Sequence, residues 1–168
     1  GLAVARVAEA GAVGGSIEDW DRERLYPVDE AVDRVRAAVA AARAVGFPFM
    51  LTARAENHIR GNPDLDDTIA RLQAYEAAGA DVLYAPGLST VEQIEAVCSA
   101  LSKPVNVLAR PTLSFSEIAG AGAQRVSVGG WLAFTAVEAL VAAATQMRDD
   151  GDFSSFRRPQ GLGEWLGA

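Results

Sequence analysis

Short apolar runs alternate with amphipathic segments along almost the whole chain, and this alternation constrains the fold more than any other feature. The apolar runs are rich in Val, Ile, Leu and Phe, which is typical of strands that are buried on both faces. We predict five strands, at residues 12–19, 47–55, 80–87, 103–111 and 124–130. The segments between and after them have helical periodicity, which predicts helices at residues 28–46, 64–80, 89–101, 114–123 and 131–147.

Regular alternation of strand and helix predicts an α/β fold in which helices cover a parallel sheet. Two architectures satisfy this pattern. One is an open, doubly wound sheet of five strands, and the other is the last five units of a (β/α)8 TIM-type barrel, which typically takes about 250 residues. The chain begins without Met in a helix-like run that closes at Gly11, and this favours the barrel. We expect barrel units over residues 1–150 and a C-terminal arm over residues 151–168.

The charge of the chain argues against several classes of partner. Lys and Arg number 15 against 22 Asp and Glu, so the formal net charge is −7, which disfavours nucleic acid and anionic lipid. No apolar run approaches the roughly 20 residues that a membrane span needs. Cys98 is the only cysteine, and its position in a helical segment predicts a buried thiol and a reducing, cytoplasmic setting.

Charged and polar residues gather where the predicted strands end. Ligands of parallel α/β folds bind beyond the C-terminal ends of the strands. The residues at those ends are Glu18 and Asp19, Arg54 and Glu56, Pro86, Asn106 to Arg110, and Ser127 to Gly130.

Glu18 and Arg54 end consecutive strands, which would lie about 5 Å apart if they are neighbours. The two side chains could form a structural ion pair. They could also serve a ligand, with Glu18 orienting a hard cation and Arg54 binding a substrate carboxylate. The two interpretations are compatible, because each side chain can hold the other until ligand and metal bind.

Three segments together resemble the isocitrate lyase and phosphoenolpyruvate mutase superfamily. They are the strand "GGSIEDW", the strand "LTARAENHIRG" and the passage "RLQAYEAAGADVLYAPG", and "PVNVLARPTLSFSEIAGAGAQRVSVGG" extends the match. The similarity spans nearly all of residues 2–150, with the segments in the family's order and at family-like spacing.

This resemblance implies a (β/α) barrel that exchanges its last helix between the subunits of a homodimer or homotetramer. It also implies Mg²⁺ as the cofactor and a small 2-oxo acid, or its enolate, as the ligand. By position, Glu18 matches the family's metal-associated glutamate and Arg54 matches the arginine that binds the substrate carboxylate. In the family, the paired aspartates that complete the metal site lie on the third strand, just before the position that matches the start of this sequence, and the 168 residues do not include them.

The chain departs from the best-known members of the superfamily at two places. The loop "DWDRERLYPVDE" has no Cys, His or Lys, whereas isocitrate and methylisocitrate lyases carry K-[KR]-C-G-H after this strand, so we do not expect isocitrate cleavage. Where lyases place a glutamate and mutases a histidine, this chain has Ala85 and Pro86. Asn106 lies in a passage typical of a less characterised branch, and we predict that it either contacts substrate or bonds a neighbouring loop.

The other rim residues have weaker functional interpretations. His58, the sole histidine, could be a general base, although a solvated loop histidine is commoner. We expect Glu56 to orient Arg54 or a loop amide, and Asp19 to accept hydrogen bonds from the next loop, with a direct metal role as its alternative. Ser127, Gly129 and Gly130 lie where barrels often bind phosphate, although glycines there also allow close packing, and Arg110 could add positive charge at the mouth.

Together these features predict a Mg²⁺-dependent carbon–carbon lyase that acts on a small 2-oxo acid, or on a related hydroxy acid, through an enolate. Glu18 and Arg54 would be its catalytic residues, with Glu18 at the metal and with Arg54 and Asn106 at the substrate. Two alternatives stay open. One is a phosphonopyruvate- or phosphoenolpyruvate-type mutase or hydrolase, and the other is a protein that binds a 2-oxo acid without turning it over.

Overall fold

The computed structural model describes residues 1–157, 161, 163 and 167, which form two compact units, Gly1–Val128 and Gly129–Ala168. The first unit contains a five-stranded sheet and five α-helices. Its strands are β1 (Gly14–Glu18), β2 (Met50–Arg54), β3 (Val82–Tyr84), β4 (Val105–Leu108) and β5 (Arg125–Ser127). Its helices are α1 (Leu2–Glu9), α2 (Val28–Arg43), α3 (Leu65–Ala77), α4 (Val91–Ser99) and α5 (Phe115–Gly120), with the 3₁₀ helix η1 (Asn57–Ile59) after β2.

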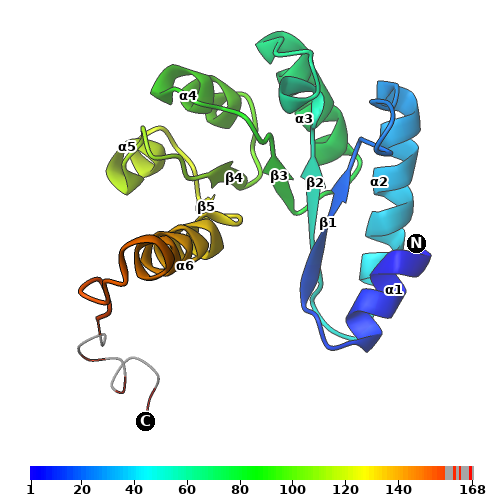
Figure 1. Cartoon of the computed structure of the whole chain (residues 1–168). Coiled ribbons are helices and arrows are strands. Elements are labelled where there is room, and N and C mark those ends of the chain that lie inside the picture. Colours follow the sequence, from blue (N-terminus) through cyan, green and yellow to red (C-terminus); the bar gives the residue numbers. More distant parts are fainter. Residues whose placement is uncertain (158–160, 162, 164–166, 168) are drawn as a thin grey trace. The chain divides into compact units, whose positions relative to one another are not determined.

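The five strands are all parallel and are ordered β1-β2-β3-β4-β5, the same order as in the chain. Helices α2 to α5 follow one another around the outer side of this curved sheet (Figure 1). A doubly wound sheet would need a reversal of strand order and helices on both faces, so that alternative is wrong. The structure confirms five consecutive β/α units of a barrel.

The predicted elements exist, but their ends differ from the sequence pattern by a few residues. The strand predicted at 47–55 comprises Met50–Arg54, and the helix predicted at 28–46 ends at Arg43. Apolar residues continue into the turns, so periodicity alone extends an element too far. The helix predicted at 131–147 is instead longer and runs to Asp150, where Gly151 stops it in a left-handed conformation (φ 64°).

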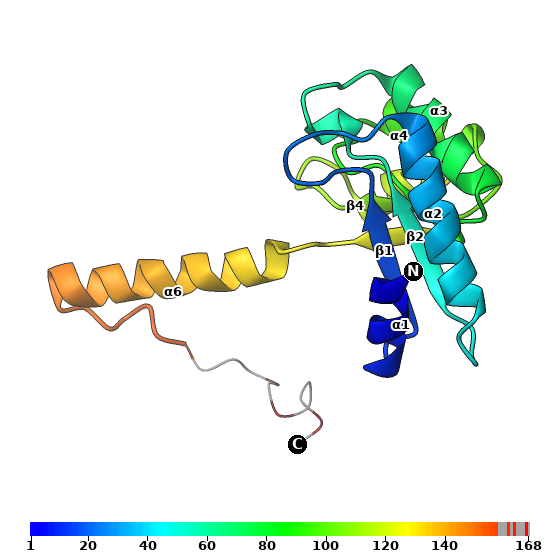
Figure 2. The same cartoon turned by 90° about the vertical axis from the view of Figure 1, so that its right-hand side faces the viewer.

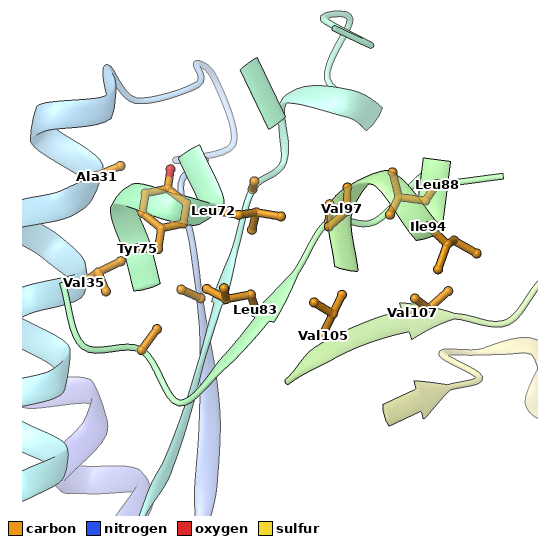
Figure 3. Packing of buried hydrophobic residues seen from close by; sticks show 14 of the residues in the cluster. Ala31, Val35, Leu72, Tyr75, Leu83, Leu88, Ile94, Val97, Val105 and Val107 are labelled. Carbon is orange, nitrogen blue, oxygen red and sulfur yellow. The ribbon is translucent and has the colours of Figure 1, made fainter. Parts of the chain in front are cut away.

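The main core lies between the outer face of the sheet and the helices. Leu83 and Val105 point outward from adjacent strands and pack with Leu72 of α3 and Val97 of α4 (Figure 3), and Ala53, in register with Leu83, belongs to the same cluster. A smaller cluster places Ala8 of α1 with Ala42 of α2 and with Phe49, the residue before β2, and α1 lies beside α2 in both views (Figures 1 and 2). Because strand side chains alternate, the neighbours of these outward residues face the concave side of the sheet.

A buried carboxylate joins the ends of two strands to a helix. Asp19, directly after β1, is only 3% exposed. Its Oδ1 accepts a hydrogen bond from the backbone N–H of Glu56 (2.7 Å), and its Oδ2 accepts from Tyr75 Oη (2.5 Å) and Arg71 Nη1 (3.2 Å). Burial, followed by the charge of Asp19, raises the pKa of Tyr75, so the phenol keeps its proton. The bonds fix the end of β1 against the end of β2 and against α3.

These contacts decide between the two interpretations of Asp19. Both carboxylate oxygens accept from protein donors, which lie after β2 and on α3 rather than in the next loop as predicted, and the side chain is enclosed. Asp19 therefore stabilises the fold, and the metal role considered for it stays a prediction. The same cluster explains why Arg71 and Tyr75 stand four residues apart. On α3 that spacing places both side chains on one face.

The second unit contains α6 (Trp131–Asp150) and the segment that follows it. Large apolar side chains of α6 are exposed, including Leu132 at 72%, Phe134 at 64% and Leu140 at 67%. At the start of the helix, a Cβ added to Gly130 would lie 2.9 Å from the ring of Phe134 on the same helix, so this contact does not test the predicted packing of helix against strand. None of the described helices is long and apolar enough to cross a membrane. The arm predicted at 151–168 lies partly outside the described residues.

We predict that Asp19→Asn lowers the free energy of unfolding by about 3–5 kcal/mol, because it removes the charge that pairs with buried Arg71. Urea denaturation of the intact protein measures this change. Asp33→Asn is the matched control, since Asp33 on α2 is 79% exposed in its ion pair with Arg36 and should change stability by less than about 0.5 kcal/mol. Equal stability losses in the two variants would contradict the structural role of Asp19.

Candidate functional site

A row of polar side chains crosses the concave face of the sheet at the C-terminal ends of the strands. The register pairs Glu18 with Arg54, Arg54 with Tyr84, and Tyr84 with Asn106. Residues in register on neighbouring strands point to the same face. The outward neighbours Ile17, Ala53, Leu83 and their equivalents pack with the helices, so this row faces the interior of the barrel units.

Arg54 is held between two carboxylates within this row. Its Nη1 lies 3.1 Å from Glu18 Oε1, while its Nε and Nη2 lie 2.8 Å and 2.6 Å from Glu56 Oε1. The guanidinium carbon is 4.9 Å from the centre of the Tyr84 ring, a cation–π contact. The structure thus brings Glu18 and Arg54 together, as the strand ends predict, and Glu56 orients Arg54 as expected.

The two glutamates differ in how firmly they hold the arginine. The Glu56 side chain is 0% exposed and also pairs with Arg60 through Oε2 (3.3 Å). The Glu18 side chain is 39% exposed, and among the described residues its Oε2 forms no ion pair. Glu18 is therefore the partner that can exchange, while Glu56 stays in place and keeps the guanidinium oriented.

Asn106 is 2% exposed and belongs to a hydrogen-bond network with defined direction. Arg125 donates from Nε to Asn106 Oδ1 (2.9 Å) and from Nη2 to Thr52 Oγ1 (2.9 Å). Asn106 then donates from Nδ2 to Ser127 Oγ (3.0 Å). Both ends of the amide thus bond the neighbouring strand β5 rather than a loop, and the predicted contact of Asn106 with substrate stays a prediction.

Tyr84 is a residue of this site that the sequence analysis did not identify. The side chain is 8% exposed and lies between Arg54 and Asn106 in the row. Burial raises the pKa of Tyr84, while Arg54 and a hydrogen bond from Ser127 oppose that rise. Its position in a strand, one residue from outward-facing Leu83, is the signal that could have indicated an inward phenol.

His58 and Arg110 lie on loops after strands and do not bond the polar row. His58 is part of η1, and burial, assisted by the charge of Arg110, lowers its pKa, so its imidazole is neutral at physiological pH. Nδ1 of His58 and Nε of Arg110 are buried without a hydrogen-bond partner among the described residues. Neither the base role of His58 nor the phosphate role of Ser127, Gly129 and Gly130 is tested by this geometry.

Two further sequence predictions concern residues with little capacity for chemistry at this rim. Cys98 lies on α4, half-buried, and burial raises the pKa of its thiol, which disfavours a reactive thiolate. Ala85 and Pro86, which follow β3, are buried and carry no titratable group. The structure thus leaves no acid or base at the place where lyases and mutases have one.

The residues present fit one part of a magnesium site. The described part of the chain holds no group of three or more His, Cys, Asp or Glu side chains that could bind a metal ion together. Mg²⁺ is often bound through one or two carboxylates with water and substrate completing its shell. Glu18, half-exposed and with one oxygen outside any ion pair, has the chemistry of such a ligand.

Comparison with known proteins places this geometry in context. An oxaloacetate decarboxylase of Rhodopseudomonas palustris is 32% identical over 145 residues, which are 82% of this chain and 47% of that protein. Another oxaloacetate decarboxylase, from Paraburkholderia xenovorans, is 36% identical over 111 residues, which are 61% of this chain and 36% of that protein. The chain spans about half or less of the length of these relatives.

Solved structures show the same fold. The crystal structure of a candidate lyase/mutase from Burkholderia cenocepacia is 49% identical, with a TM-score of 0.92 over 99% of this chain and 63% of that one. An oxaloacetate acetylhydrolase in complex with the product oxalate is 26% identical, with a TM-score of 0.82 over 96% of this chain and 57% of that one. A phosphonopyruvate hydrolase in complex with oxalate and Mg²⁺ is also 26% identical, with a TM-score of 0.79 over 99% and 62%.

The family model described as phosphoenolpyruvate phosphomutase matches residues 1–148, nearly all of the barrel units and most of α6. The strand order agrees with the barrel that the sequence resemblance implied. The chain belongs to the phosphoenolpyruvate mutase family.

Proposed function

We propose that the protein is a Mg²⁺-dependent carbon–carbon lyase of small 2-oxo acids, with oxaloacetate as the first substrate to test. The observation that carries this proposal is the position of Arg54 between a buried glutamate and an exchangeable one. Relatives named oxaloacetate decarboxylase and a structure of oxaloacetate acetylhydrolase support the choice of oxaloacetate.

Arg54 is the group that binds the substrate carboxylate in this proposal. Glu56 holds its Nε side, so the guanidinium keeps its orientation when a ligand carboxylate replaces Glu18 at Nη1. Glu18 becomes free to serve as a metal ligand, and a bound Mg²⁺ would supply polarisation of the oxo group. The ring of Tyr84 contacts the Arg54 guanidinium through a cation–π interaction.

Two alternatives remain proposals of lower rank. A mutase or hydrolase of phosphonopyruvate type is supported by the similarity to phosphonopyruvate hydrolase, but Ala85 and Pro86 stand where mutases have a histidine. A protein that binds a 2-oxo acid without turnover would have the same polar row. Product analysis after incubation with oxaloacetate, phosphonopyruvate or 2-oxoglutarate separates these cases, since binding without consumption would favour the last.

We predict that Arg54→Lys weakens oxalate binding roughly 10- to 100-fold, because lysine keeps the charge beside Glu56 but lacks the planar fork that a carboxylate needs. Titration calorimetry on the intact protein with Mg²⁺ measures this change. Arg36→Lys is the control, since Arg36 lies on α2 with a 64% exposed side chain and should bind oxalate normally. Unchanged affinity in Arg54→Lys would remove Arg54 from the site.

We predict that Mg²⁺ increases oxalate affinity in the wild-type protein and that Glu18→Gln loses most of this increase. The reason is that an amide is a much weaker ligand than a carboxylate for a hard cation. Calorimetry with and without Mg²⁺ gives the comparison, and Glu23→Gln in the exposed loop after β1 is the matched control. The metal role of Glu18 is wrong if Mg²⁺ strengthens oxalate binding equally in both variants.

We also propose that α6 mediates a homodimer or homotetramer by packing against a second copy of the chain. The exposed apolar side chains of this helix support the proposal, since a contiguous apolar surface of this kind usually marks an interface. Packing of α6 onto its own barrel units is the alternative.

We predict a dimeric or tetrameric mass for the wild-type protein and a monomeric mass when Leu132, Phe134 and Leu140 are all replaced by Ser, because the apolar contact is removed. Size-exclusion chromatography with light scattering measures the mass. Thr135→Ser on the same helix is the control, and circular dichroism checks that helix content is retained. A monomeric wild-type protein would refute the proposed assembly.

A further inference from the structure

The acid that protonates the product is missing from the proposed mechanism, and the polar row contains one unassigned candidate, the hydroxyl of Tyr84. Tyr84 is in register with Arg54 on one side and with Asn106 on the other. It therefore lies on the concave face, one strand from the group that would bind the substrate carboxylate. The ring is almost fully buried against the Arg54 guanidinium.

The hydrogen bonds beside Tyr84 have a defined direction. An arginine only donates, so Asn106 presents its oxygen to Arg125 and its nitrogen to Ser127. Both ends of the amide are therefore used within the sheet. Among the described residues no acceptor takes a hydrogen bond from the Tyr84 hydroxyl, so its proton is available to a ligand.

The surroundings suit a group that gives up a proton and recovers it. Burial is the largest influence on Tyr84 and raises its pKa, so the phenol is protonated at neutral pH. Arg54 and Arg110 act in the opposite direction, which means that they stabilise a transient phenolate. Glu56 is enclosed by Arg54 and Arg60, and Asp19 is bonded to three donors, so neither carboxyl group competes for this role.

We propose that Tyr84 is the proton donor of the reaction, an inference that rests on the proposed lyase function. With oxaloacetate, the bond between C3 and its carboxylate breaks, carbon dioxide leaves, and the electron pair forms the enolate of pyruvate. The Oη–H bond of Tyr84 breaks and a C3–H bond forms, which gives pyruvate. A solvent water molecule returns a proton to the phenolate, so no further reactant is needed.

Tyr84→Phe tests the proposal, because phenylalanine keeps the ring beside Arg54 and removes only the hydroxyl. On the intact protein with Mg²⁺, oxalate should bind within about threefold of wild type, while kcat for oxaloacetate should fall roughly 10²- to 10⁴-fold. In the remaining turnover, carbon dioxide should appear before pyruvate, because the enol leaves the site and gains its proton in solution. Lactate dehydrogenase reports the keto form of pyruvate, and wild type should release both products together.

Tyr26→Phe is the matched control, since Tyr26 is equally buried, at 8% exposed, and lies in the core. A Tyr84→Phe variant that keeps its kcat, loses oxalate binding, or releases both products together would overturn Tyr84 as the donor while leaving the lyase intact. A wild-type protein that neither binds oxalate nor consumes oxaloacetate would instead overturn the proposed function, and this inference with it.

Discussion

The buried carboxylate of Asp19 determines the different positions of the two adjacent acids at the end of β1, Glu18 and Asp19. Its three donors come from the end of β2 and from α3, so the chain cannot rotate about this strand end without breaking the bonds of Asp19 with Arg71 and Tyr75. Because successive strand residues point to opposite faces, fixing Asp19 toward the helices fixes Glu18 toward the concave face. The candidate site depends on this constraint, since Arg54 finds Glu18 only when β1 and β2 end at the same level.

The parts of the fold that sequence patterns predict are those set by local preferences. Alternating strand and helix periods predict five β/α units, and sequential strands tend to be neighbours, so the pairing of Glu18 with Arg54 is also predictable. The residue that caps a helix is harder to predict from sequence. A Ser89–Glu92 capping box is plausible by spacing, yet the helix is capped one residue later, by Thr90, which accepts from the N–H of Gln93. Single-residue choices of this kind depend on how the preceding loop arrives.

The parts that sequence patterns miss are contacts between distant residues. Asp19 and Tyr75 are 56 positions apart, and nothing in the sequence near either one indicates that they bond. Tyr84 ends an apolar strand that looks buried throughout, so its polar tip is easily overlooked. Its neighbours become evident only through the register, which places it between Arg54 and Asn106. The orientation of the Asn106 amide is also invisible to sequence patterns, because it is set by the hydrogen bond that Arg125 donates from the last strand of the sheet.

The electrostatic balance of the rim determines what the proposed acidic ligand would meet there. Glu18, Arg54, Glu56 and Arg60 form one connected group of two cations and two anions, so its formal charge is zero. A ligand carboxylate that bound Arg54 would give this group a net negative charge unless Glu18 paired with another cation. Removing one partner from a buried ion pair is costly, whereas a half-exposed pair is exchanged at little cost. In the proposed function, the difference in exposure between Glu18 and Glu56 would make the binding of a cation and of an oxo acid cooperative, because each would remove the obstacle to the other.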